Sequence, residues 1–270
     1  MALKDITLGQ YFPGTTIIHR LDPRVKIIGT IAYIVALFLA KWLVSYAIML
    51  VLLAALIAVS KIGLKSILQG MKPIFIIVLI TGLLNLFYTP GQGEPLVSFW
   101  VFTIYREGVW AACAMVLRIA MLITCTFLLT YTTSPITLTD GLERLLRPLK
   151  KVGFPVHELS MIMSIALRFI PTLIQETDKI ISAQKARGAD FDTGGLVQKA
   201  KALIPILIPL FISSFRRAEE LAVAMECRCY HGDDGRTSLR QLVMHGRDWG
   251  LVVFSLALCA GIIALRVLGL

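Results

Sequence analysis

Residues 156–188 read VHELSMIMSIALRFIPTLIQETDKIISAQKARG, and residues 196–229 read LVQKAKALIPILIPLFISSFRRAEELAVAMECRC. Each stretch ends with an arginine between two small residues, Ala186-Arg187-Gly188 in one and Cys227-Arg228-Cys229 in the other. The two arginines lie 41 positions apart, and Ala183 and Ala224 occupy matching places before them. Two similar basic tips on two long helices predict a device that binds two similar partners.

The stretch 134–235 predicts three consecutive amphipathic helices. The first begins near 137–140 and ends around Pro148 and Gly153, and its leucines recur at helical spacing. The second covers 156–187, with a kink at Pro171 and Gly188 as its C-terminal cap. The third covers 196–228. Its apolar run 202–212 is too short to cross a membrane and indicates an interfacial or buried segment.

The composition excludes an ordinary soluble domain. The chain has 270 residues, of which 57% are hydrophobic and 16% charged, and its mean hydropathy is +0.77. These values are typical of a polytopic membrane protein. The net charge of +10 fits lysine and arginine in cytoplasmic loops, and no run of like charge indicates a nucleic-acid tail. We therefore expect an all-α membrane protein whose partners include the lipid bilayer and no nucleic acid.

Apolar runs predict about five membrane spans. The two loops that matter for orientation are 60–72, which carries three lysines, and 90–105, which contains Gly, Pro and aromatic residues and is expected on the outer surface. The predicted spans are 27–40, 43–59, 73–89, 107–131 and 250–268.

The distribution of lysine and arginine predicts the orientation. The N-terminal flank and the loop 60–72 are basic, whereas the opposite loops carry only Lys41 and Arg106. By the positive-inside rule the N-terminus is cytoplasmic and Leu270 lies outside. The expected organisation is an N-terminal segment with four spans (1–131), a cytoplasmic coupling-helix region (132–249) and a fifth span (250–270).

The segment before the first span predicts a helix start. Asp22 is a good N-cap and Pro23 fits the first helical position. Arg24 and Lys26 then lie at the mouth of the span, where a cap and a basic membrane anchor are sufficient explanations. The region 1–13 lacks the apolar core of a cleaved signal peptide.

Few residues suggest chemistry. Arg118, near the middle of the fourth predicted span, is either a functional residue or an arginine that bonds carbonyls or a carboxylate inside the bundle. Asn85 is expected to bond a neighbouring helix. The pattern Cys227-x-Cys229-x-His231 lacks a second ligand pair, so no metal site is predicted.

Arg187 and Arg228 each have a simple explanation, because a basic residue in the last turn of a helix interacts favourably with the helix dipole. The repetition of an arginine between small residues at two helix ends favours docking instead. Small neighbours let a partner's backbone approach closely, and a guanidinium can bind a carboxylate or carbonyls with its planar fork.

Four motifs, spread over nearly the whole chain, are specific enough to suggest a family. They are His19-x-Leu21-Asp22-Pro23-Arg24-x-Lys26, Ala166-Leu167-Arg168-Phe169-Ile170-Pro171, Ala183-Gln184-x-Ala186-Arg187-Gly188 and Cys227-Arg228-Cys229. With them the sequence resembles the EcfT family, the transmembrane coupling subunits of energy-coupling-factor (ECF) type ABC importers, although the second tip departs from Ala-Arg-Gly.

The resemblance implies a non-catalytic scaffold in the bacterial cytoplasmic membrane, for the uptake of vitamins or metal ions. Its partners would be two ABC-type ATPase subunits, each receiving one arginine tip, and a substrate-binding membrane subunit. No cofactor is expected in this chain, and it has no G-x-x-x-x-G-K-[ST] loop for ATP. The residues expected to bind the substrate subunit are Ile170, Leu173, Ile174, Leu207, Leu210 and Phe211.

Two other readings remain open. A stand-alone secondary transporter or channel needs several polar residues at mid-membrane or a paired internal repeat, whereas the spans contain Arg118, Asn85 and no convincing repeat. An intramembrane enzyme needs clustered catalytic groups. The four histidines are scattered and lie outside the predicted spans.

Overall fold

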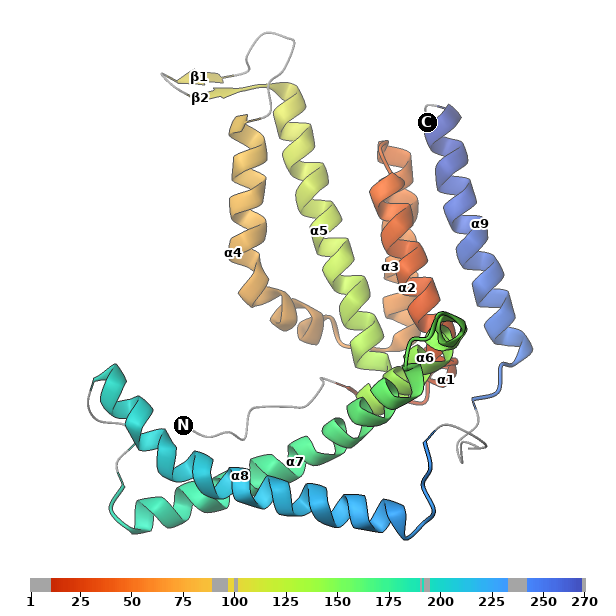
Figure 1. Ribbon diagram of the computed structural model, residues 1–270. Helices are drawn as coiled ribbons and strands as arrows, with labels where there is room; N and C mark the ends of the chain where they lie inside the picture. Colours follow the sequence, from red (N-terminus) through yellow and green to blue (C-terminus); the bar gives the residue numbers. More distant parts are fainter. Residues whose placement is uncertain are drawn as a thin grey trace. The chain divides into compact units, whose positions relative to one another are not determined.

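The chain is almost entirely helical and divides into two compact units in a computed structural model (Figure 1). One unit contains residues 9–141 and 242–270, and the other contains 142–241 together with the first eight residues. The predicted organisation, with boundaries after 131 and after 249, stays a prediction. The residues that the structure describes are 11–88, 97–99, 102–189, 191, 195–232 and 242–268.

The first unit is a bundle of long helices. Within it α2 packs against α5 and α9, α3 packs against α5, and α4 lies along α5. The buried core includes Tyr33, Leu37, Met49, Met121 and Ile262. Its elements are α1 (Ile17–Arg20), α2 (Pro23–Leu39), α3 (Leu43–Ser60), α4 (Leu64–Tyr88), β1 (Val97–Phe99), β2 (Phe102–Ile104), α5 (Arg106–Thr132) and α9 (Gly246–Leu268).

Two glycines let α4 approach α5 closely. A Cβ atom on Gly70 would lie 2.8 Å from Cε2 of Phe127, and one on Gly82 would lie 2.9 Å from Cγ2 of Val116. Small residues at such contacts are typical of membrane helices, where packing rather than hydrophobic burial drives association. The α4–α5 pair therefore depends on two positions without side chains.

The second unit contains the helices expected to form the coupling region. Helix α6 (Pro135–Leu146) runs across the division into a 3-10 helix, η2 (Arg147–Val152), which ends at Gly153 with a φ of 83°. Two helices of 31 residues follow, α7 (Val156–Ala186) and α8 (Leu196–Glu226). Their predicted extents, 156–187 and 196–228, are therefore close to the observed ones. Both contain proline and continue through it.

Within the described ranges, five helices are long and apolar enough to cross a membrane, the number that was predicted, but the set differs. Helix α2 covers the first predicted span, has 17 residues and is not among the five. Its length is about 25 Å, below the roughly 30 Å of a hydrocarbon core. The qualifying helices are α3, α4, α5, α7 and α9. Helix α7 is the least apolar of them, and its predicted place in the cytoplasm stays a prediction.

Two local predictions were wrong. The basic loop 60–72 is helical from Leu64, so α4 begins before Pro73 and contains it. The loop 90–105 contains an antiparallel pair, with Val97 opposite Ile104 and Phe99 opposite Phe102. Strands of three residues are too short to leave a periodic signal in the sequence. Most of the aromatic side chains of this loop lie outside the described residues.

Candidate functional site

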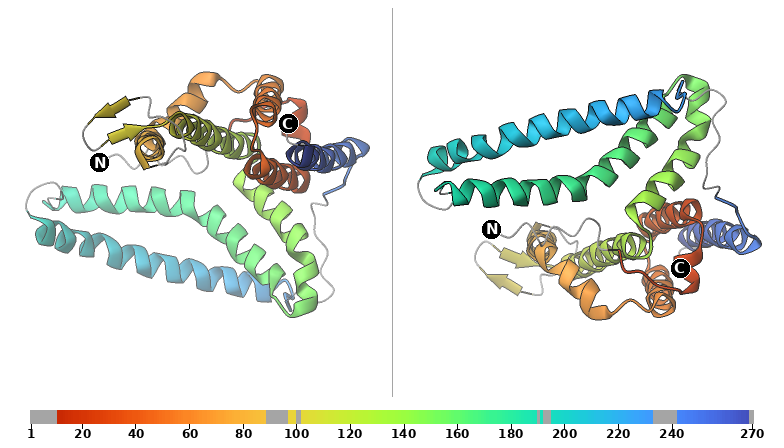
Figure 2. Two further views of the ribbon diagram at one scale, coloured as in Figure 1. Left: turned by 90° about the horizontal axis from the view of Figure 1, so that it is seen from above. Right: turned by 90° about the horizontal axis from the view of Figure 1, so that it is seen from below.

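Helices α7 and α8 form an antiparallel pair (Figure 2). Arg217 donates to Oε2 of Glu176 at 2.6 Å, and the side-chain amide of Gln184 donates to the carbonyl of Pro205 at 3.4 Å. The end of α7 therefore lies beside the early part of α8. The ion pair between Arg217 and Glu176 fixes which residues of α7 and α8 lie side by side. It adds little to the stability of the helix pair, because surface ion pairs are worth about 0–1 kcal/mol.

The first tip ends in a hydrogen-bonded helix stop. Arg187 is the residue after the last helical one, and Gly188 follows with a φ of 87°. The amide of Ala189 donates to the carbonyl of Gln184 at 3.0 Å, and that of Gly188 donates to Lys185 at 3.0 Å. This is the Schellman pattern, in which a residue of left-handed conformation closes the helix. It confirms Gly188 as the C-terminal cap and leaves Arg187 exposed.

The second tip repeats this geometry although its sequence differs. The amide of Tyr230 donates to Met225 at 3.1 Å, and that of Cys229 donates to Glu226 at 2.9 Å. Cys229 takes the left-handed conformation, with a φ of 54°. Every one of these positions matches the first tip at the offset of 41 that separates the arginines. Arg228 is therefore presented in the same backbone frame as Arg187, and it is also exposed.

The two tips differ in charge and strain. The last turn of α7 contains Lys185, whereas the matching residue of α8 is Glu226. A cation is favourable at the negative end of a helix dipole, and an anion is not. Cys229 also carries a Cβ atom in a conformation that favours glycine. The tips share a shape but are not electrostatically equivalent.

The antiparallel pairing sets the arginines far apart. Arg187 lies next to the part of α8 around Pro205, and the rest of α8 then runs to Arg228 at the other end of the pair. At 1.5 Å per residue that stretch of helix is about 35 Å long. One small binding groove could not receive both arginines, so the arrangement suits two separate grooves.

The predicted apolar platform is partly exposed. Leu207 and Phe211 are 57% and 65% exposed, whereas Ile170, Leu173, Ile174 and Leu210 are half-buried. Phe211 also packs edge-on against Phe215, with ring centroids 4.7 Å apart. The structure adds apolar side chains to this surface of α8 that the prediction did not include; they are Leu203, Ile204, Ile208, Ile212 and Phe215, each at least 50% exposed.

Glu143 is a residue of this unit that the sequence analysis missed. It lies on α6, and its carboxylate accepts from Ser160 at 2.7 Å and bonds Nδ1 of His157 at 3.0 Å. It thereby ties α6 to the first turns of α7. No sequence pattern indicated this contact, because its partners lie beyond the 3-10 helix.

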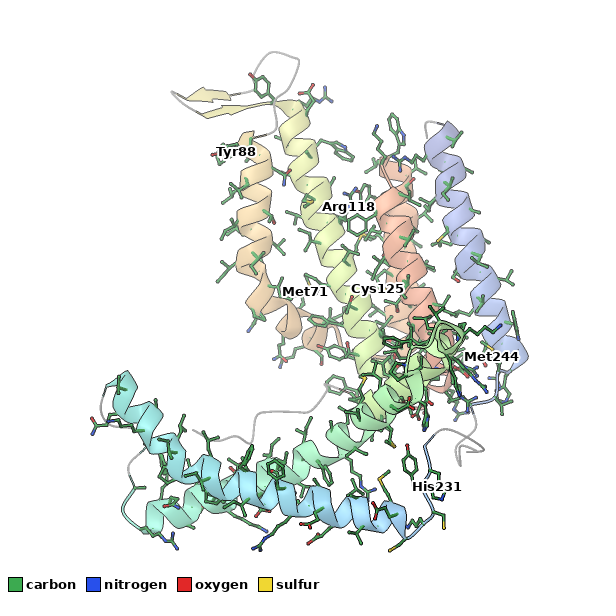
Figure 3. All side chains as sticks on the ribbon, in the orientation of Figure 1. Met71, Tyr88, Arg118, Cys125, His231 and Met244 are labelled. Atoms are coloured by element: carbon green, nitrogen blue, oxygen red, sulfur yellow. The ribbon has the colours of Figure 1, made fainter. Side chains whose placement is uncertain are left out.

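Arg118 binds a helix end inside the other unit (Figure 3). Its Nη2 donates to the carbonyl of Ala40 at 3.2 Å and to the hydroxyl of Tyr46, and its guanidinium stacks over the rings of Phe38 and Tyr46. Ala40 is the C-cap of α2, where a positive charge is favourable. Of the two readings left open by the sequence, the bonding of bundle carbonyls is the one observed.

The side-chain amide of Asn85 donates to the carbonyl of Thr81 in the same helix at 3.0 Å. The hydrogen bond to a neighbouring helix that was expected for Asn85 is not among the contacts of the described residues.

The N-terminal motif ties three helix ends together. The carboxylate of Asp22 caps α2 and accepts from Arg24 at 2.8–3.0 Å, while the backbone amide of Asp22 donates to Asp248 at 3.2 Å. Lys26 is 8% exposed and donates to the carbonyl of Thr132 at 3.0 Å. The cap was predicted correctly, whereas the burial of Lys26 and its hydrogen bond to the end of α5 were not predicted.

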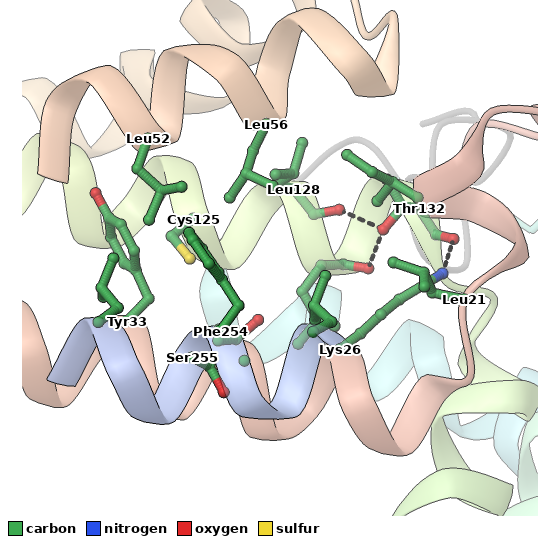
Figure 4. A pocket seen from close by; sticks show the side chains of 16 residues that line it. Leu21, Lys26, Tyr33, Leu52, Leu56, Cys125, Leu128, Thr132, Phe254 and Ser255 are labelled. Carbon is green, nitrogen blue, oxygen red and sulfur yellow. Dashed lines mark hydrogen bonds between the residues drawn. The ribbon is translucent and has the colours of Figure 1, made fainter. Parts of the chain in front are cut away.

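A cavity of about 120 Å³ lies beside Lys26 in this unit (Figure 4). Its walls are mainly apolar and come from α2, α3, α5 and α9; they include Tyr33, Leu52, Leu56, Cys125, Leu128 and Phe254. Among the described residues no group of three or more His, Cys, Asp or Glu side chains could hold a metal ion. The described residues therefore form two helix tips, apolar helix surfaces and a small apolar cavity beside Lys26, which are features suited to binding a partner.

Comparison with known proteins points in one direction. The family model described as Cobalt transport protein (CbiQ) matches residues 14–239. The chain is 56% identical over 258 residues to the energy-coupling factor transporter transmembrane protein EcfT of Clostridium kluyveri, covering 96% of this chain and 94% of that protein. It is 51% identical over 256 residues to the protein of that name from Acidaminococcus fermentans, covering 94% and 95%. The similarly named protein of Bacillus subtilis is 45% identical over 264 residues, covering 98% and 99%.

Proposed function

Because this chain belongs to the family of energy-coupling factor transporter transmembrane proteins, we propose that it is the coupling subunit of an ECF-type importer. It transmits the ATP-driven motion of two ABC-type ATPase subunits to a substrate-binding membrane subunit. ATP is bound and hydrolysed by the partners, so this chain is non-catalytic and holds no cofactor. The cargo is a vitamin or a metal ion, and the family description, cobalt transport protein, supports the latter class.

The protein resides in the bacterial cytoplasmic membrane, with its N-terminus and the α7–α8 pair in the cytoplasm. The support is the distribution of lysine and arginine along the sequence. The apolar surface of α8, with Leu207 and Phe211 exposed, receives the substrate-binding subunit. Apolar surface of this extent needs a partner or lipid to cover it.

The matched geometry of the two arginine tips carries this proposal. Arg187 and Arg228 follow helices of equal length, precede a residue of left-handed conformation and stand in the same hydrogen-bonded frame. A single helix-dipole cap explains one such arginine. Two at opposite ends of an antiparallel pair are better explained by two copies of one kind of partner, with Ala186, Gly188, Cys227 and Cys229 as the small neighbours that admit it.

The test replaces the arginines one at a time and together. Truncating a buried, charge-paired arginine typically costs about 2–5 kcal/mol, because its partner is left unpaired. Arg187→Ala or Arg228→Ala should weaken transport more than assembly, and the double variant should release the ATPases. Arg187→Lys should be a partial defect, since an ammonium group keeps the charge but loses the planar fork. Co-purification of ATPase subunits and ATP-dependent substrate uptake are the measurements.

Arg216→Ala is the matched control, because Arg216 is an exposed arginine of α8 away from the tip. It should assemble and transport like the parent. If the double alanine variant did the same, the arginines would be simple helix caps, and the docking of ATPases at these tips would be wrong.

A further inference from the structure

A hollow of about 460 Å³ opens beside Arg118, on the bundle side away from Lys26. It lies where the turn between α2 and α3 faces α4 and α5. Lys41 and Trp42 come from the turn, Asn85 from α4, and Trp110 and Arg118 from α5. None of the residues that line it is acidic. A hollow with two cations, an amide and two indoles is suited to an anion.

Both cations have hydrogen-bonding capacity to spare. Arg118 donates from Nη2 to the carbonyl of Ala40 and to the hydroxyl of Tyr46, and its Nε is buried without a partner among the described residues. A guanidinium has five N–H donors, and the two on Nη1 have no partner among the described residues. Lys41 is exposed and forms no ion pair within the described chain. An anion in the hollow would accept from both.

The level of the turn indicates where the anion comes from. Arg118 contacts the end of α2 about 18 Å along α5 from the start of that helix at Arg106. Helix α2 is about 25 Å long, which is shorter than a hydrocarbon core of roughly 30 Å. Its neighbour α5 has 27 residues and is longer than that core. A bilayer meets such a mismatch by thinning or by drawing headgroups inward. Trp42 and Trp110, 47% and 48% exposed, are of the type that lies at headgroup level.

The surface next to the hollow is also apolar and uncovered. Phe38, which stacks on Arg118, is 61% exposed, and Leu84, which precedes the lining residue Asn85 on α4, is 49% exposed. Acyl chains attached to a headgroup in the hollow would therefore find apolar side chains beside it. A free anion from water would gain nothing from these contacts.

We propose that the Arg118–Lys41 hollow binds the phosphate of an anionic phospholipid, in the leaflet that meets the α2–α3 turn. The phosphate oxygens accept from Arg118 and Lys41, and the indoles of Trp42 and Trp110 flank the headgroup. The bound lipid then occupies the space beside α5 that the shorter helix α2 leaves uncovered. This site is separate from the arginine tips and from the substrate-subunit surface, and it does not depend on the proposed function.

Tryptophan fluorescence can test the site in the full chain. Trp100 and Trp249 are replaced by Phe, so that Trp42 and Trp110 report. The protein, in neutral detergent, is titrated with phosphatidylglycerol or phosphatidylcholine brominated on the acyl chains close to the glycerol. Saturable quenching by phosphatidylglycerol at lower concentrations than phosphatidylcholine is expected. Lys41→Gln should weaken the binding of phosphatidylglycerol about fivefold. A lysine near an anionic headgroup is worth about 1 kcal/mol, and a change of about 1.4 kcal/mol alters the dissociation constant tenfold.

Lys65→Gln is the matched control, because Lys65 is an exposed lysine in the first turn of α4, outside the hollow. It should leave the quenching curve unchanged. Equal quenching by both lipids, or equal effects of the two lysine variants, would overturn the proposal.

Two further arms separate other occupants. Inorganic phosphate at millimolar concentration should not displace the brominated lipid; if it does, the hollow is a site for free anions. In the assembled transporter, carbodiimide coupling of Lys41 to a carboxylate of the substrate-binding subunit should be absent. Efficient coupling would assign the hollow to a protein contact and refute the lipid.

Discussion

Lys26 illustrates how a charged residue is kept in the interior of the helix bundle. Its ammonium group donates to the carbonyls of His19 at 3.3 Å and Thr132 at 3.0 Å and to the hydroxyl of Thr133 at 3.2 Å. An ammonium has three donors, and each has an acceptor here. Thr132 is the last residue of α5, whose terminal carbonyls have no partner within the helix. The lysine thus serves as a helix cap supplied by a distant segment.

His19, in the short helix before Lys26, bonds the hydroxyl of Thr16 at 2.6 Å and the carbonyl of Phe12 at 3.1 Å. Burial holds the pKa of His19 below its usual value, against the raising effect of the Phe12 carbonyl. The ring is therefore neutral at physiological pH. The contacts of this N-terminal segment depend on hydrogen bonds and not on a histidine charge.

The residues of left-handed conformation at the two tips, Gly188 and Cys229, predict opposite effects of substitution on the stability of the last helical turn. A Cβ atom in this conformation costs about 1 kcal/mol or more relative to glycine. Gly188→Ala should therefore loosen the last turn of α7, and Cys229→Gly should tighten the last turn of α8. Amide hydrogen exchange of those turns should change about fivefold in each case, faster in the first variant and slower in the second.

Gly250→Ala provides the control for this pair, because Gly250 lies within α9 with open space around it and no positive φ. It should leave exchange at both tips unchanged. Faster exchange in α8 after Cys229→Gly would show that the thiol, and not the backbone, stabilises that tip.

At the scale of elements, α8 has two different halves. Its first half exposes large apolar side chains on several sides, and its second half carries charged residues such as Arg217, which pairs with Glu176 of α7. Ile206 is buried in the first half of α8, whereas its neighbours Leu207 and Ile208 are exposed. The helix therefore keeps most of its apolar surface for something other than α7.

A charge on the exposed half of α8 should release the substrate-binding subunit. Leu207→Glu would place a carboxylate in an apolar interface, where burial of an unpaired charge costs several kcal/mol. Because Leu207 is 57% exposed, the change should leave the α7–α8 pair folded and the ATPases bound. Val223→Glu, 53% exposed in the other half, should keep both kinds of partner. Co-purification in detergent measures each outcome, and retention of the substrate subunit by Leu207→Glu would place its binding surface elsewhere.

At the scale of the whole molecule, the main question is which helices cross the bilayer. Helix α7 is long and apolar enough to do so. Helix α2 has only 17 residues and, at about 25 Å, is shorter than a hydrocarbon core of roughly 30 Å. The face of α7 that carries Glu158, Arg168, Glu176 and Asp178 argues against lipid on all sides, because ionisable residues in hydrocarbon are costly.

We therefore predict that both ends of α7 lie on one side of the membrane. In a chain without native cysteines, Glu158→Cys and Ser182→Cys should both react with a membrane-impermeant maleimide in inside-out vesicles and neither in intact cells. A cysteine placed after Leu270 should react in the opposite way, as an external C-terminus requires. Reaction of the two α7 positions from opposite sides would establish α7 as a span and overturn the proposed cytoplasmic helix pair.

The sequence by itself determined several helix ends and the position of the two arginines, although it missed the start of α4 at Leu64. The N-cap Asp22, the stop at Gly153 and the cap Gly188 were predicted correctly, because capping depends on residues only a few positions apart. The same local logic identified the length of α7 and α8 and the family resemblance of the arginine motifs.

Only the tertiary structure decided what those elements contact. Arg118 bonds Ala40, 78 positions away, and Lys26 bonds Thr132, 106 positions away. The equivalence of Cys229 with Gly188 also needed the backbone, since the residue types differ while the φ angles agree in sign. The physical reason is that a polar side chain in a helix bundle can be satisfied by any end of any neighbouring helix. Which end it meets is fixed when the helices pack, and no spacing within one helix records that choice.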